Sequence, residues 1–77
     1  NHDVETNIFP NPTHESVTIQ TNRTIKSIEV FDCLGKRVKY ISSPNSNIVQ
    51  LEELNKGVYF IKIKSTFSTS VHPVVKE

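Results

Sequence analysis

The chain contains no methionine or tryptophan, only two glycines and a single cysteine in 77 residues, and, read through, no alanine. Alanine is the best helix former, so its absence disfavours a helical domain. Valine and isoleucine together supply 17 residues and threonine another seven, and these β-branched side chains fit a pleated sheet. The composition therefore predicts an all-β domain.

Further absences exclude whole classes of protein. A lone Cys33 forms no disulfide within the chain and assembles no cysteine metal cluster. The longest apolar runs, such as residues 58–61, are far shorter than the roughly 20 residues of a membrane-spanning helix. Nine Lys and Arg against eight Asp and Glu leave no excess of cations for a phosphate backbone. We expect one small domain with no transmembrane segment, no nucleic-acid partner and little room for an enclosed active site.

Seven segments have the apolar and β-branched character of short strands, and turn residues separate them. They are residues 8–9, 16–20, 25–31, 36–41, 48–51, 57–65 and 71–76. Gly35 supplies the positive φ of a tight turn, so segments 25–31 and 36–41 should pair antiparallel. Pro73 lacks an N–H and places the last segment at a sheet edge or a bulge. Seven short strands at this spacing are typical of a β-sandwich or barrel.

No group of residues in the sequence has the spacing of a catalytic or metal site. His2, His14 and His72 are isolated from one another and from the cysteine, whereas a zinc site needs three or four convergent ligands. Cys33 follows Phe31 on the same face of the pleat and is expected to be a small, half-buried apolar residue beside a turn. We therefore expect no catalytic residue, no metal and no cofactor.

Cationic and aromatic side chains alternate in the middle and near the end of the chain. They are Lys36, Arg37, Lys39, Lys62, Lys64 and Lys76 with Tyr40, Tyr59 and Phe60. Such interleaving suits a stacking platform for sugar or single-stranded nucleic acid, but it is more often a solvated strand face that discourages edge pairing. The alternative function is thus a retained adhesion or carbohydrate-binding module that binds through Tyr40 and Tyr59.

Three pieces of sequence in a fixed order resemble a known family. They are Phe-Pro-Asn-Pro at residues 9–12, an apolar segment that ends in Asp-Cys-Leu-Gly-Lys-Arg-Val at 32–38, and Leu-Asn-Lys-Gly-Val-Tyr at 54–59. The residues that carry the likeness are Pro10, Asn11, Pro12, Asp32, Gly35, Lys36, Val38, Leu54, Gly57, Val58 and Tyr59. The chain resembles, over residues 8–76, the type A C-terminal sorting domain of the type IX (Por) secretion system. It departs from that pattern at Gln50, at His72-Pro73 and in the absence of glycine from residues 65–69.

The resemblance implies a non-catalytic export signal fused behind a cargo protein. Such a domain is read by the type IX translocon and by outer-membrane shuttle proteins. A cell-surface sortase then cuts ahead of it and joins the cargo to lipopolysaccharide. The expected route runs through the periplasm to the outer membrane and cell surface of a Gram-negative cell, where the domain is released. Residues 1–7 would be a flexible lead-in from cargo and residues 8–77 the sorting domain. A start at Asn1 rather than Met fits a piece of a longer precursor.

The fold that we expect is a seven-stranded antiparallel β-sandwich of the immunoglobulin-like kind. Gly35, Asn55 and Gly57 should serve turns, while Val30 and Tyr59 should serve the core. Our hypothesis for the recognition surface is the final strand with the adjoining segment 57–64, because an edge strand is open to binding by strand addition. Its residues are Val71, His72, Pro73, Val74, Val75, Lys76 and Glu77.

Overall fold

The computed structural model describes residues 6–9, 15–22 and 24–77, and these residues form strands and turns without a helix. The strands are β1 (Asn7–Phe9), β2 (Ser16–Gln20), β3 (Ile25–Asp32), β4 (Arg37–Ser42), β5 (Ile48–Gln50), β6 (Gly57–Ser65) and β7 (Thr69–Lys76). All seven predicted strands are therefore confirmed, with ends that differ by at most two residues. The expected turn at Pro10-Asn11-Pro12 lies outside the described residues.

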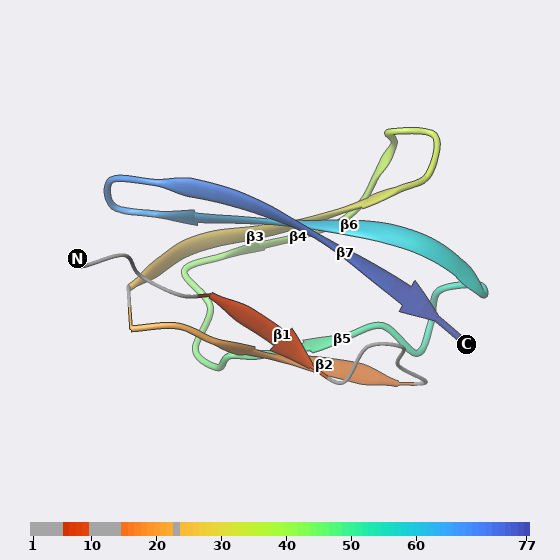
Figure 1. The fold of residues 1–77 in the computed structure, drawn as a ribbon, viewed down its shortest axis with the longest axis horizontal. Coiled ribbons are helices and arrows are strands. Elements are labelled where there is room, and N and C mark those ends of the chain that lie inside the picture. The colour runs from red at the N-terminus through yellow and green to blue at the C-terminus, as the bar shows by residue number, and fades with distance from the viewer. Residues whose placement is uncertain (1–5, 10–14, 23) are drawn as a thin grey trace.

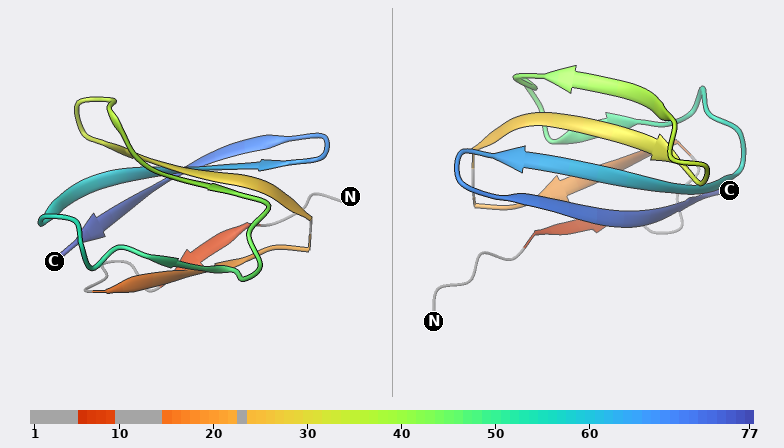
Figure 2. Two further views of the ribbon diagram at one scale, coloured as in Figure 1. Left: turned by 180° about the vertical axis from the view of Figure 1, so that it is seen from behind. Right: turned by 90° about the horizontal axis from the view of Figure 1, so that it is seen from above.

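The strands form two antiparallel sheets that face each other (Figure 1). The smaller sheet has the order β1-β2-β5 and the larger has the order β4-β3-β6-β7. The view from above shows the larger sheet covering the smaller one (Figure 2). As predicted, β3 and β4 form an antiparallel hairpin. The all-β class is thus confirmed, and β3 and β6, far apart in the sequence, become the central pair of the larger sheet.

The core lies between the two sheets, and the period-two pattern decides which side chains enter it. On β3, Ile28 and Val30 are fully buried while Glu29 and Phe31 point to the outer face. β6 follows the same rule, with one face buried and the alternate residues more exposed. The buried apolar residues are Val17, Ile19, Ile28, Val30, Val49, Leu51, Tyr59, Ile61, Ile63 and Val74. Both sheets contribute to this single cluster, so each sheet buries its apolar face against the other. The core roles predicted for Val30 and Tyr59 are confirmed.

The turn between β3 and β4 is organised by Asp32. Its Oδ1 accepts hydrogen bonds from the backbone N–H groups of Leu34 and Lys36, each at 2.9 Å. Gly35 adopts a φ of +86° and donates its N–H to the Asp32 carbonyl at 3.0 Å. This is the conformation expected of a glycine in a short hairpin turn. Cys33 lies within this turn and is exposed, so the predicted half-buried position is wrong. β3, on which Cys33 would have followed the half-buried Phe31, ends at Asp32.

Candidate recognition surface

β7 is the last strand of the larger sheet, where Pro73 is tolerated. It pairs with β6 along its whole length, with Val75 opposite Val58, Pro73 opposite Phe60 and Val71 opposite Lys62. The pairing shows no register shift, so the edge position rather than a bulge accommodates the proline. The predicted edge location of the final strand is confirmed.

The alternation of side chains along β7 is the reverse of that expected for a strand that covers a core. Ser70, His72 and Lys76 lie on the inner face, opposite Ile63, Ile61 and Gly57 of β6. Val71, Pro73 and Val75 are exposed on the outer face, and the exposed fraction of Val71 is 57%. Antiparallel sheets with one covered face usually carry apolar residues inward and polar residues outward. Within β7 only Val74, on the inner face, and Thr69, on the outer face, follow that rule.

The polar residues on the inner face of β7 are held away from water. Burial lowers the pKa of the His72 imidazole below its usual value of 6.5, and its Nε2 lies 3.0 Å from the Ser70 hydroxyl. Lys76 is only 8% exposed, and its Nζ donates to the Glu77 carbonyl at 3.5 Å. Desolvating the His72 imidazole costs free energy that a valine at this position would not. The arrangement of β7 is therefore not explained by core packing.

Most residues of the sequence motif build the fold. Asp32 and Gly35 make the β3–β4 turn in which Lys36 is exposed, whereas Val38 and Leu54 are half-buried against the core. The remaining motif residues are Gly57, which opens β6 with a φ of +152°, the buried Tyr59, and Val58, which is 42% exposed on the outer face. Pro10, Asn11 and Pro12 lie outside the described residues, as do His2 and His14.

The structure does not assemble the proposed stacking platform of aromatic and cationic residues. Tyr59 is only 7% exposed, and its hydroxyl donates to the Asn55 carbonyl at 2.7 Å, so it cannot share a binding face with Tyr40. Tyr40 is exposed on β4 and stacks with Arg37, whose guanidinium carbon lies 4.9 Å from the ring centroid. The alternative binding face of Tyr40 and Tyr59 is therefore wrong. The two tyrosines lie on different faces of the larger sheet, because Tyr59 points into the core on the same face of β6 as Ile61.

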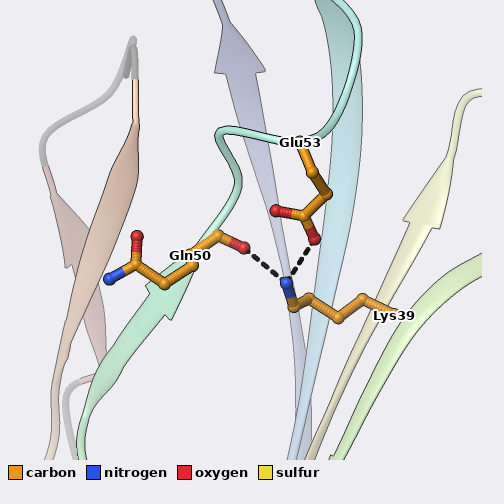
Figure 3. Close-up of polar contacts among 3 residues, drawn as sticks. All are labelled: Lys39, Gln50 and Glu53. Carbon is orange, nitrogen blue, oxygen red and sulfur yellow. Dashed lines mark hydrogen bonds and ion pairs between the residues drawn. The ribbon is translucent and has the colours of Figure 1, made fainter.

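Lys39, predicted to be one of the solvated cations, joins the two sheets instead. Its Nζ donates to the Gln50 carbonyl at 2.8 Å and to Glu53 Oε2 at 2.5 Å (Figure 3). Lys39 is on β4 of the larger sheet, while Gln50 ends β5 of the smaller sheet. The ammonium hydrogen bond is the main reason that the pKa of the Glu53 carboxyl is below its usual value of 4.5. This tie closes the sandwich on the side opposite β7.

We expect Lys39→Met to weaken the fold and to change its pH dependence. Because the pKa of Glu53 is lowered in the folded chain, the ion pair stabilises the fold fully above pH 4.5. That contribution is lost as the pH falls through the lowered pKa, so the difference in stability between the two chains should shrink in acid. Urea unfolding measured from pH 7 to pH 2 tests this. Lys56→Met is the control, because Lys56 is an exposed cation in the turn that contains Glu53. Identical pH profiles for Lys39→Met and the unaltered chain would contradict a stabilising ion pair between Lys39 and Glu53.

The described residues contain no cluster of three or more His, Cys, Asp or Glu side chains arranged to hold a metal ion. Nor does any helix long and apolar enough to cross a membrane occur among them. What remains as a candidate site in this part of the chain is a surface. It comprises the exposed side of β6 and β7 together with the edge that β7 forms.

Comparison with known families agrees with the motif and with the two-sheet fold. The family model of the secretion system C-terminal sorting domain matches residues 7–77, from the first residue of β1 to the end of the chain. No curated protein matches the chain. The match includes both sheets, the Asp32 turn and the final strand. The chain therefore belongs to the C-terminal sorting domains of the type IX secretion system.

Proposed function

We propose that this type IX sorting signal is read through β7 and the adjoining strand β6. The recognition residues of the proposal are those of the final strand from Val71 to the C-terminal Glu77, together with residues 57–64. The observation that carries it is the reversed alternation of β7, which turns Val71 and Val75 toward solvent at 57% and 41% exposure. The arrangement reduces the number of apolar side chains that β7 buries in the core. It is explained if a partner binds the residues on the outer face. The translocon and the outer-membrane shuttle proteins are the partners.

The second part of the proposal concerns the fate of the domain after export. Residues 1–7 are the lead-in from an N-terminal cargo, and residues 8–77 are the sorting domain. A cell-surface sortase cuts ahead of the domain and joins the cargo to lipopolysaccharide, and the domain is released. Support comes from the family match, which begins at residue 7. Sorting-signal domains are generally non-catalytic, so the chain acts as a ligand and then as a substrate. The cargo passes the periplasm and ends at the cell surface.

The third part of the proposal is that the two sheets form an immunoglobulin-like sandwich. The order β4-β3-β6-β7 corresponds to the C′-C-F-G sheet of such domains, and β1-β2-β5 corresponds to their A-B-E strands. The supporting feature is the central pair β3–β6, which corresponds to strands C and F. In this scheme β7 corresponds to strand G, the last strand of its sheet. The proposal places the recognition surface on the F-G side of the larger sheet.

Deleting residues 74–77 from a reporter fused ahead of the chain is expected to abolish surface display. The deletion removes four of the seven proposed recognition residues of the final strand, and display is measured by protease accessibility of the reporter on intact cells. Mass spectrometry of the displayed, unaltered fusion reports cleavage, with a mature product that ends before Ile8. A displayed reporter that retains residues 8–77 would contradict removal by a sortase.

Because Val74 is fully buried, the deletion also removes a core side chain. Val49→Ala is the matched control, since Val49 is equally buried but lies on β5 of the smaller sheet. Display that survives Val49→Ala and fails after the deletion supports recognition through β7. Normal display of the truncated fusion would show that the final strand is not read.

A further inference from the structure

The outward residues of β7 join those of β6 in one exposed apolar stripe, called here the outer band. The outer band consists of Val58 and Phe60 on β6 and Val71, Pro73 and Val75 on β7. Val58 lies opposite Val75 and Phe60 lies opposite Pro73, so the side chains are cross-strand neighbours. The exposed fractions of Val58, Phe60 and Val75 are 42%, 37% and 41%. Contiguous exposed apolar surface of this kind marks an interaction site more often than scattered residues do.

The rest of the outer face is built differently. On β3 and β4, Glu29 accepts a hydrogen bond from Arg37 at 3.0 Å and lies opposite Tyr40, while Arg37 stacks on that ring. These polar groups are occupied by one another. Next to them, Phe31 is half-buried and lies opposite Phe60, so the outer band borders an aromatic residue of the central strand. The apolar part of the face therefore lies on β6 and β7 and borders Phe31 of β3.

One end of the outer band is positively charged. Lys62 lies opposite Val71 and Lys64 opposite Thr69, and both lysines share the outer face of β6. Glu29 is in register with Lys62, but its carboxylate is already bonded to Arg37. Neither lysine forms an ion pair with any residue that the structure describes. The outer band is therefore apolar at Val58 and Val75 and is flanked at its other end by the cationic Lys62 and Lys64.

We propose that the outer band binds an extended protein segment of the secretion machinery that is apolar at one end and acidic at the other. The inference rests on the proposed function, that this domain is read through β6 and β7. An acidic segment complements the charge at Lys62 and Lys64, and apolar side chains cover Val58 and Val75. Because neighbouring strands lie about 4.8 Å apart, the two strands make a stripe roughly 10 Å wide. From Val71 to Val75 the stripe is about 13 Å long, since each step along a strand is about 3.3 Å. That shape fits one extended chain, whereas a lipid surface would cover the whole face, including the polar groups of β3 and β4.

The test uses the reporter fusion with two double variants of outer-face residues. Val71→Thr with Val75→Thr keeps the shape and β-branching of both side chains but replaces one methyl group of each with a hydroxyl group. Lys62→Glu with Lys64→Glu reverses the charge of the cationic end. The threonine pair should lower surface display about tenfold, which is the change expected for the loss of two buried methyl groups at an interface. The glutamate pair should also lower display, because like charges then face the acidic segment. Ile48→Thr and Lys56→Glu are the matched controls, because Ile48 is 50% exposed on the other sheet and Lys56 is exposed in a turn. Both controls should display normally.

The possible outcomes separate this inference from the proposed function. If deleting residues 74–77 abolishes display but both double variants display like their controls, the outer band is not the binding face although β7 is still read. If the deletion itself displays normally, the proposed function fails. Thermal unfolding of each purified variant reports its fold. If the threonine pair lowers the unfolding midpoint, the lysine pair, in which Lys64 is exposed and Lys62 half-buried, decides alone. Cosedimentation of the chain with phosphatidylglycerol vesicles, lost in both double variants, would overturn the protein segment in favour of a membrane surface.

Discussion

Replacing Tyr59 by alanine is expected to destabilise the chain by about 3–5 kcal/mol, the usual cost of truncating a buried aromatic side chain. Tyr59 is only 7% exposed and belongs to the single core cluster shared by the two sheets. The free energy of unfolding of a domain this size is roughly 4–12 kcal/mol, so the substitution removes a large share of it. Chemical denaturation of the purified variant measures the loss directly, and we expect a parallel fall in the display of a fused cargo.

The matched variant Tyr59→Phe separates the ring from its hydroxyl. It keeps the buried ring but loses the hydrogen bond to the Asn55 carbonyl, so it should cost only about 1 kcal/mol. This hydrogen bond fastens the turn before β6 to the start of that strand. Equal losses for the two variants would mean that the hydroxyl rather than the packed ring supplies the stability.

Ile61→Ala is expected to cost about 2–5 kcal/mol, because it leaves a cavity in the middle of the core. Ile61 is fully buried on β6, where it lies opposite Val30 of β3 on one side and His72 of β7 on the other. Urea unfolding should show the loss as a shift of the midpoint. The smaller truncation Ile61→Val should cost about 0.5–1.5 kcal/mol.

Ile48→Ala is the control for a general effect of removing isoleucine, since Ile48 is half exposed on β5. It should change stability far less than Ile61→Ala. If the two alanine variants were equally destabilised, the core would not be centred between the sheets at Ile61.

The sequence predicts the strands well because their alternation is clear. Ile28 and Val30, or Tyr59 and Ile61, share one face with period two, and the structure buries each pair. Asp32 and Gly35 carry recognisable turn chemistry, so the β3–β4 hairpin was also predictable. The motif order pointed to the family that the comparison then found.

The predictions for Cys33 and Lys39 are wrong because the period-two pattern does not show where a strand ends or bulges. Cys33 was placed by continuing the pleat of β3 beyond Asp32, where the strand stops and the turn lifts the thiol into solvent. Lys39 was treated as a solvated cation, but the register between β3 and β4 shifts next to Val30. That bulge leaves Lys39 opposite Val30 and turns it toward the smaller sheet. Only the pairing of the strands in the structure shows which way these two side chains point.

The reversed faces of β7 were likewise not predictable from its own residues. A one-residue change of register would exchange its two faces, and in a hairpin the register is set by the turn. The turn between β6 and β7 is fixed by Ser65, whose N–H and hydroxyl both bond to Ser68. The turn thus imposes a register that places the polar residues of β7 inside.

This register also determines how strongly the final strand is held. To the shared apolar core β7 contributes Val74 alone, whereas β6 contributes Tyr59, Ile61 and Ile63. Segments with few buried apolar contacts open at a lower free energy than the rest of a domain. The backbone ladder to β6 therefore retains β7 more than burial does. A partner that draws this strand away from the sheet would disturb little of the hydrophobic interior, so reading of the signal through β7, as proposed, would not require the whole domain to unfold.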